Sequence, residues 1–199
     1  MTTFADGLYQ YGGMAVGSYM HAPLLNKNSK TWWVDGTNGA DGNSGKKPTL
    51  AFATIQRAED VASKGDVIYV FPKMMAATDT DPTSYAETVI VNTPQLSIIG
   101  VSHGCTQGGL PQIKIGAGST AMLTIRAPGV LVANMGFNGG SSTGGGILLD
   151  DDGGSTKSAF GTTIIGCHFK NCVGTTATNA ATGGAIQWSS DGGAWQVLI

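Results

Sequence analysis

The strongest acidic cluster of the sequence is Asp150-Asp151-Asp152, directly after the apolar run 147–149. Two carboxyl groups on one face could act as general acid and general base in the cleavage of a sugar chain. Because alternate side chains of an extended stretch share a face, Asp150 and Asp152 form the candidate catalytic pair, and Asp151 points away. The two glycines that follow favour a solvated turn instead. We therefore expect no catalytic residues and keep this pair as the alternative.

Two tryptophans near the end of the sequence are candidates for binding sugars. Trp188 and Trp195 flank Asp191, and exposed indoles such as these can stack on sugar rings. The same residues could pack in a core or against another subunit. We favour the packing role and keep Trp188, Asp191 and Trp195 as candidate glycan-binding residues.

No metal or cofactor site is expected. Asp35, Asn38, Asp41 and Asn43 have part of the spacing of a calcium loop, but the glutamate that closes such a loop is missing, so turn chemistry is favoured. The three cysteines, Cys105, Cys167 and Cys172, form no CxxC pair and have no zinc-ligand spacing with a histidine, so they are expected to be small core or turn residues. His168 is expected to be a surface histidine on a strand, facing away from its neighbour Phe169.

Composition narrows the class of protein that positions these residues. The chain has 31 glycines among 199 residues and only 12% charged residues, which is typical of tight turns and short strands. The net charge is −2, and the 11 lysines and arginines are scattered, so a nucleic-acid partner is not expected. No apolar run has the ~20 residues of a membrane span, and the start of the chain lacks the pattern of a signal peptide. We expect a protein made in the cytoplasm that does not enter a membrane.

The first 31 residues keep neither the helical nor the strand period, which predicts an extended amino-terminal tether. Its exposed apolar side chains would reduce solubility unless they dock on another surface. The candidate docking residues are Phe4, Leu8, Tyr9, Tyr11 and Met14. A disordered terminus is the alternative.

A glycine-rich loop and one amphipathic helix follow in residues 32–66. The helix is expected over 54–63, with Thr54 as its N-cap and Gly65 as its stop signal. Its apolar face would be Ile55, Ala58, Val61 and Ala62.

From residue 67 to 199 the pattern changes to short β-branched strands between glycine, asparagine and aspartate turns. Strands are expected at 67–70, 88–91, 96–99, 113–115, 122–125, 130–132, 147–149, 163–165 and 185–188, after a first strand at 32–35.

An internal repeat indicates how these strands are arranged. Three segments share a β-branched run, a small residue and then a residue able to point inward: 96–104, 130–138 and 162–171. The inward residues, His103, Phe137 and Phe169, lie 34 and 32 residues apart, which is a period of stacked repeat architectures. Equivalent side chains of such a stack form columns, so Phe137 should lie over Phe169. A β-sandwich of hairpins stays open as the alternative.

Residues 32–138 resemble the start of the pectin-lyase-like right-handed β-helix proteins. The matching pieces, in order, are Val34-Asp-Gly-Thr-Asn-Gly-Ala-Asp-Gly-Asn-Ser-Gly45, Pro48, Phe52-Ala-Thr-Ile-Gln56, Gly65-Asp-Val-Ile-Tyr-Val-Phe-Pro72, Glu87 and Leu96-Ser-Ile-Ile-Gly100. The resemblance implies an all-β chain, a right-handed parallel β-helix solenoid, whose amphipathic helix caps the first coil. The repeat spacing puts the next inward residue near residue 201 (169 + 32), so we expect the coils to be incomplete at the carboxyl end, where a further stretch of chain or a neighbouring subunit would cover them.

The leader Gly7-Leu-Tyr-Gln-Tyr-Gly-Gly-Met14 resembles that of phage-encoded members of the same group. This resemblance implies a bacteriophage virion protein, a head or tail spike or decoration, assembled in the host cytoplasm as a homotrimer. It would dock on capsid, portal or tail proteins by its leader and contact bacterial surface polysaccharide. The favoured function is non-enzymatic, and a tailspike polysaccharide depolymerase is the alternative. The catalytic motifs of the enzymes in this group are not reproduced in order, so no catalytic role is carried over.

Overall fold

The computed structural model describes residues 29–74, 83–101, 109–114, 121–139, 145–153, 157–172, 184–188 and 197–199. This part of the chain is mostly β, with few helical residues. None of its helices is long and apolar enough to cross a bilayer. Several residues named above lie outside the described ranges: the five docking candidates Phe4, Leu8, Tyr9, Tyr11 and Met14, together with His103, Cys105, Asp191 and Trp195.

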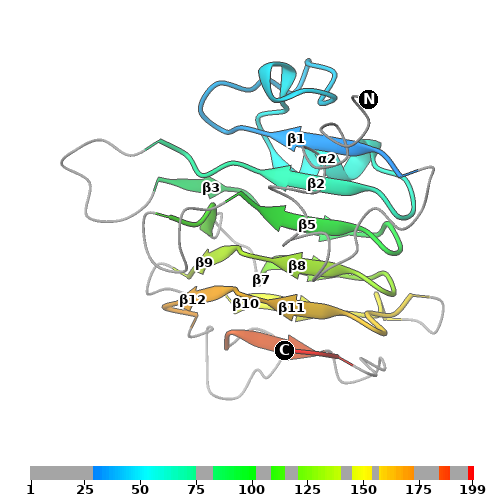
Figure 1. The fold of residues 1–199 in the computed structure, drawn as a ribbon. Coiled ribbons are helices and arrows are strands. Elements are labelled where there is room, and N and C mark those ends of the chain that lie inside the picture. Colours follow the sequence, from blue (N-terminus) through cyan, green and yellow to red (C-terminus); the bar gives the residue numbers. More distant parts are fainter. Residues whose placement is uncertain are drawn as a thin grey trace, which may run out of the picture.

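The strands form three parallel sheets, here called A, B and C (Figure 1). Sheet A contains β1 (Thr31–Val34), β2 (Val67–Val70), β5 (Ser97–Gly100), β8 (Leu131–Ala133) and β11 (Thr163–Ile165). Sheet B contains β3 (Ser84–Ala86), β6 (Gln112–Lys114), β9 (Gly136–Asn138) and β12 (His168–Lys170). Sheet C contains β4 (Val89–Val91), β7 (Ala121–Ile125), β10 (Gly145–Leu149) and β13 (Ile186–Trp188).

From β2 onward the chain passes through sheets A, B and C in turn, and then returns to sheet A. Each strand therefore pairs with the strand of the same sheet in the next repeat, and not with its neighbour in sequence. Two-residue hairpins cannot make parallel pairs, so the alternative of a hairpin sandwich is wrong for the described strands. The arrangement is compatible with a parallel β solenoid.

The register of the sheets aligns equivalent side chains in columns. In sheet B, Tyr85 pairs with Ile113, Ile113 with Phe137, and Phe137 with Phe169. The rings of Phe137 and Phe169 are stacked, with centroids 5.1 Å apart and an interplanar angle of 12°. The predicted stacking of this pair is confirmed.

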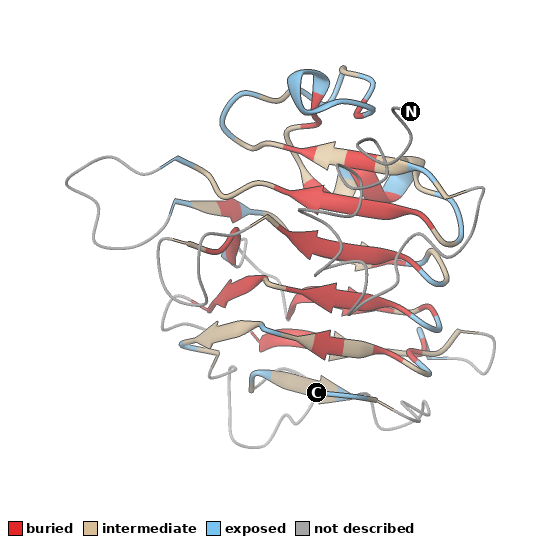
Figure 2. Ribbon diagram, in the orientation of Figure 1, coloured by how far each residue is buried: buried red, intermediate tan, exposed pale blue. Residues whose placement is uncertain are grey.

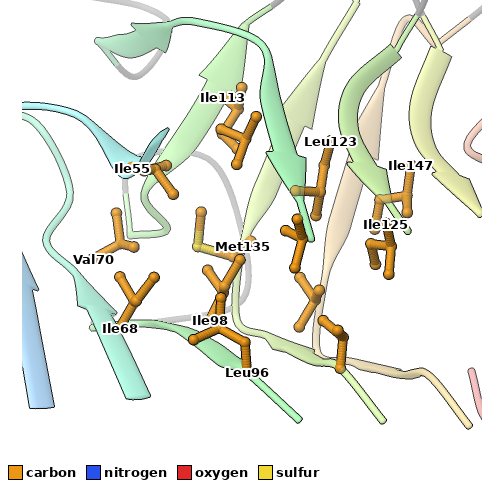
Figure 3. Close-up of a cluster of buried hydrophobic side chains, with 14 of the residues drawn as sticks. Ile55, Ile68, Val70, Leu96, Ile98, Ile113, Leu123, Ile125, Met135 and Ile147 are labelled. Atoms are coloured by element: carbon orange, nitrogen blue, oxygen red, sulfur yellow. The ribbon is translucent and has the colours of Figure 1, made fainter. Parts of the chain in front are cut away.

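The core lies between the three sheets and is filled by the alternate side chains that point inward (Figure 3). Ile68 and Ile98 come from sheet A, Ile113 from sheet B, and Leu123 and Ile147 from sheet C, and all are fully buried. Branched aliphatic side chains can fill such a space at close to crystal density.

The predicted helix is present but shorter than expected. It is α2 (Ile55–Val61), and the Thr54 side chain accepts a hydrogen bond from the Arg57 backbone N–H at 3.2 Å, as predicted for an N-cap. Ile55 and Ala58 are fully buried, and α2 contacts β1, β2 and β4. Its last turn ends before Gly65 because the chain bends there toward β2, with the Asp66 carboxylate accepting the Ser63 N–H at 2.8 Å.

Sheet B also contains strands that the sequence pattern did not predict. β3 and β9 each carry one large inward residue, Tyr85 or Phe137, between small or polar neighbours. Such a strand has no β-branched run, so propensity alone gives no signal for it. Only the repeat marks β9, through its inward residue Phe137.

Candidate functional site

The candidate carboxylates lie on a corner where the chain leaves sheet C. Arg126 follows β7 and Asp150 follows β10, the neighbouring strand, so their side chains come from adjacent repeats of the stack. The Asp150 backbone N–H donates to the Ile125 carbonyl at 2.8 Å, and the Arg126 N–H donates to the Val91 carbonyl at 2.8 Å. These bonds extend the parallel ladder by one residue and place the two side chains next to each other.

Both candidate carboxylates are paired with cations. Arg126 Nε lies 2.7 Å from Asp150 Oδ2, and Arg126 Nη1 lies 2.6 Å from Asp152 Oδ1. Lys157 Nζ lies 2.7 Å from Asp152 Oδ2. The prediction that Asp150 and Asp152 face the same side is consistent with this geometry, and the arginine between them was not predicted.

The aspartates of this cluster sit in a turn. Asp152 and Gly153 both adopt the left-handed conformation, with φ of 59° and 69°. Asp151 is buried, and its carboxylate accepts the Gly153 N–H at 3.0 Å. The expected turn is therefore present, but its middle carboxylate is buried rather than solvated.

The electrostatics of the cluster favour the ionised form of Asp152. The hydrogen bond from Lys157 lowers the pKa of Asp152, and the positive charges of Arg126 and Lys157 act in the same direction. A general acid needs a carboxyl group whose pKa is raised toward neutrality. The pKa of Asp152 is lowered instead of raised. Asp152 is therefore suited to forming ion pairs with Arg126 and Lys157 and not to donating a proton.

A buried carboxylate with a raised pKa does exist, at the start of α2. Burial raises the pKa of Glu87, whose two oxygens accept the backbone N–H groups of Ile55 and Gln56, both at 3.0 Å. Burial likewise raises the pKa of the neighbouring Tyr85 hydroxyl, which donates to the Phe71 carbonyl and accepts the Gly36 N–H. The Glu87 carboxylate and the Tyr85 hydroxyl already make hydrogen bonds that hold the loop and the helix in place, so their role is structural.

The described cysteines behave as expected for packing residues. Cys167 and Cys172 are free thiols that pack against the core. Burial raises the pKa of Cys167 to about 11 and also raises that of Cys172, which favours the protonated thiol at neutral pH. His168 is half-buried on β12, next to Phe169.

The glycine-rich loop uses its aspartates to bind backbone N–H groups. The Asp35 carboxylate accepts the N–H groups of Thr37 and Asn38 at 2.8 and 3.1 Å, as expected for a turn residue. The Asp41 carboxylate accepts those of Ala53 and Thr54 at 2.9 and 3.0 Å. Asp41 therefore ties the loop to the residues directly before α2 and does not act within a local turn. Within the described ranges, no three His, Cys, Asp or Glu side chains are grouped so as to hold a metal ion.

Trp188 occupies a core position rather than an outward one. It pairs with Leu149, which pairs with Ile125 and then Val91, all three of them inward-facing core residues. Trp188 is nevertheless 68% exposed, because no described residue covers this last strand of sheet C. Its register position is that of a core side chain on the last described strand of sheet C, and both the packing role and the glycan-binding role stay predictions.

A shallow hollow that sequence reasoning missed runs along the turns that enter sheet A. It is lined mainly by Lys64, Pro94, Gln95, Pro128, Gly129 and Phe160. The turns are stacked through backbone bonds from Gln95 to the Pro128 carbonyl at 2.8 Å and from Gly129 to the Phe160 carbonyl at 2.7 Å. The ring of Phe160 is 45% exposed. Residues 94, 128 and 160 recur with the same period as the strands. That recurrence was the signal in the sequence that could have predicted the stacked turns of this hollow.

Comparisons with known proteins identify no family for this chain. No family model and no curated protein matches the chain. Among solved structures, a rhamnogalacturonan lyase has a TM-score of 0.42 and 14% sequence identity to it. The match covers 80% of this chain but only 62% of the length of the lyase. The strand pairings themselves show a mostly β protein built of parallel sheets, and its similarity to that lyase is weak.

Proposed function

We propose that the chain is a right-handed parallel β-helix of the pectin-lyase-like kind and a non-enzymatic structural protein of a bacteriophage particle, a head or tail spike or decoration. The parallel register of the three sheets, the inward columns and the helix over the first strands support the fold. The phage-like leader of the sequence supports the virion assignment.

The observation that carries the non-enzymatic part is the pairing of Asp150 and Asp152 with Arg126 and Lys157. A carboxylate pair that cleaves sugars needs one protonated member and room for substrate or water between the two. Here the guanidinium of Arg126 occupies that room and bridges two adjacent repeats. The cluster therefore stabilises the stack instead of presenting reactive groups.

A particle component must withstand conditions outside the cell, and the fold suits that purpose. Each inner strand of a parallel stack pairs on both sides, and its inward side chains are fully buried. Local opening of such a strand breaks two ladders at once, so the free energy of opening is expected to be high in the middle of the stack.

The partners are part of the proposal. The leader residues Phe4, Leu8, Tyr9, Tyr11 and Met14 attach the protein to capsid, portal or tail proteins, and the protein assembles as a homotrimer in the host cytoplasm. Contact with bacterial surface polysaccharide would use exposed aromatic side chains, and Phe160 in its hollow joins Trp188 as a candidate. Mass spectrometry of purified particles tests the assignment directly: the chain should be present in a fixed ratio to the capsid protein. Its absence from particles that carry its gene would overturn the proposal.

The competing function is a depolymerase of bacterial polysaccharide. The observation in its favour is that Arg126 lies between two carboxylates, since lyases of acidic polysaccharides can use an arginine base. Incubation with host capsule or lipopolysaccharide, followed by an assay for reducing ends or unsaturated products, separates the two functions. We expect no products. Products made by the parent protein but not by the double variant D150N/D152N would establish the enzyme.

A further inference from the structure

The turns that enter sheet A form two columns of their own. The register of the sheet aligns four of these turns, because β2, β5, β8 and β11 pair in order. The residues at equivalent positions of the four turns therefore lie one above the other. The first column is Lys64, Pro94, Pro128 and Phe160, and the second is Gly65, Gln95, Gly129 and Gly161. All of these residues except Gly65 line the hollow described above.

One residue of the second column differs from the other three. All four members adopt the left-handed conformation, with φ of 82° at Gly65, 55° at Gln95, 70° at Gly129 and 67° at Gly161. Glycine adopts this conformation without steric cost, whereas a residue with a Cβ is strained in it. Gln95 is therefore the member of the column that keeps a side chain at a conformational cost. Strain of this kind is concentrated at sites where a side chain has a function.

The Gln95 side chain lies along the hollow with its polar end unpaired. A Cβ at position 129 would come within 3.2 Å of Gln95 Cγ, so this side chain extends over Gly129. Gln95 is exposed, and its amide makes no hydrogen bond to a described residue. Lys64 is exposed as well, and it makes no ion pair within the described ranges. The hollow thus presents an amide and an ammonium group to a ligand.

We propose that this hollow binds a short stretch of an acidic polysaccharide, whose sugars carry carboxylate groups, with the sugar chain lying along the stack. The ring of Phe160, which is 45% exposed, stacks on the apolar face of one sugar. The Lys64 ammonium pairs with a sugar carboxylate, and the Gln95 amide hydrogen-bonds to a sugar hydroxyl. This inference rests on the proposed contact with bacterial surface polysaccharide, and it gives that contact a site and a chemical class.

The dimensions of the hollow fit a sugar chain. Lys64 and Phe160 are three strand spacings apart in the first column, which is roughly 14 Å at about 4.8 Å for each spacing. This span is longer than one sugar ring, and Pro94 and Pro128 provide apolar surface between its two ends. The volume of the hollow is about 180 Å³. Pockets that enclose a whole small ligand have roughly 300–1,000 Å³, so the ligand expected here passes along the hollow and is not enclosed by it.

A protein partner is the competing occupant of the hollow. A stable protein–protein interface buries about 800 Å² on each partner, which is much more than a hollow of this size provides. The charge of the lining also favours an acidic glycan. The described residues that line the hollow include the cation Lys64 and no carboxylate, so a negatively charged ligand meets attraction without repulsion there.

The binding test uses an array of purified bacterial polysaccharides, in which each acidic glycan is also present with its carboxylates reduced to alcohols. The full-length protein should bind at least one acidic glycan, and it should bind the reduced form of that glycan about threefold or more weakly. Binding to no glycan, or equal binding to the acidic and reduced forms, would overturn the proposal. Mass spectrometry of purified particles decides the virion function independently, so a particle protein that binds no glycan would refute this inference alone.

Two variants with matched controls locate the binding. F160A should weaken binding about tenfold, because the stacking ring is lost. L50A removes a side chain that is also 45% exposed but does not line the hollow, and it should leave binding unchanged. K64Q should weaken binding of the acidic form about threefold without affecting the reduced form, whereas K47Q, at another exposed lysine, should affect neither. Parental binding by F160A and K64Q would overturn the proposal.

A third variant, Q95G, separates a binding role from a structural one. Glycine suits the left-handed conformation, so Q95G should unfold at the same temperature as the parent protein or at a higher one. Its binding of the acidic glycan should nevertheless fall about threefold, because one hydrogen bond to the ligand is lost. Thermal unfolding by circular dichroism and the same array measure the two effects. A lower unfolding temperature with unchanged binding would show that Gln95 serves the turn, and it would contradict the proposal.

Discussion

The two ends of the stacked sheets differ in how their inward side chains are covered. At the β1 end, α2 buries Ile55 and Ala58 completely against the first strands. At the β13 end, Trp188 has the same kind of inward position but is exposed, and Leu198 and Ile199 are exposed as well (Figure 2). The position of a residue in its column therefore determines which way its side chain points. Whether the side chain is buried depends on the strands or helix packed on both sides of it.

The helix end also carries buried carboxylates that tie α2 and the segments around it to the first strands. Oε1 of the buried Glu59 accepts the backbone N–H groups of Asn92 and Thr93 at 2.9 and 3.0 Å and the Thr93 hydroxyl at 3.0 Å. Glu87 ties the first turn of α2, and Asp66 accepts the Trp32 indole N–H at 2.9 Å. The stability of the stack should accordingly decrease from the β1 end toward the β13 end.

The largest expected effect is in the phenylalanine column. Phe137 is fully buried, so F137A should lower the free energy of unfolding by about 3–5 kcal/mol. Phe169 is half-buried one repeat further on, and F169A should cost roughly half as much. Urea unfolding of both variants measures the difference. Equal losses would contradict a decrease in stability along the stack.

The anchors of the helix come next. E59A removes the acceptor of three hydrogen bonds and should cost about 1–3 kcal/mol, because the donors of Asn92 and Thr93 lose their partner. D60A, at the exposed neighbouring residue of the same helix, should change the free energy of unfolding by less than about 0.5 kcal/mol. The same urea experiment compares the two. If both variants lost the same small amount, Glu59 would not anchor the helix.

The pH dependence of stability should report on Glu87. Burial raises the folded-state pKa of this carboxyl above its ordinary value of 4.5, so the native state binds more protons than the unfolded state above that pH. Its contribution to stability is therefore full below pH 4.5 and is lost as the pH rises through the folded-state pKa. E87Q should flatten the decline above pH 4.5 relative to the parent protein. Unfolding curves of the two proteins at several pH values between 4 and 7 measure the difference.

The smallest expected effect is at the β13 end of the stacked sheets. W188A should change the free energy of unfolding by less than about 1 kcal/mol, because most of the indole is already in water. In the same column, L149A should cost about 2–5 kcal/mol, because Leu149 is buried. A large loss for W188A, which would show that Trp188 is covered in solution, would remove the contrast between the two ends.

The sequence predicted those parts of the fold that depend on repeated local patterns. The β-branched runs gave the strands of sheets A and C, and the spacing of Phe137 and Phe169 gave their stacking. Sheet B was missed in part, because β3 and β9 each hold a single large residue between small or polar ones. The N-cap Thr54 and the inward residues Ile55 and Ala58 followed from the helical period.

The candidate site was less predictable, since it depends on contacts across the repeats. The aspartate run is visible in the sequence, but the ion pair of Asp150 with Arg126 joins residues 24 positions apart and needs the register of β7 and β10. Glu59 and Glu87 look like surface residues until the helix is placed on the first strands. The sequence marked Trp188, but only its pairing with Leu149 shows that it faces the core side.

The most direct test of the stacking is the contact between the rings of Phe137 and Phe169. A nuclear Overhauser spectrum of protein in which only phenylalanine rings carry protons should show a cross-peak between these two rings, since their centroids are 5.1 Å apart. The cross-peak should vanish in F169L. Assigned ring signals with no cross-peak between them would contradict the stacked arrangement and with it the whole account.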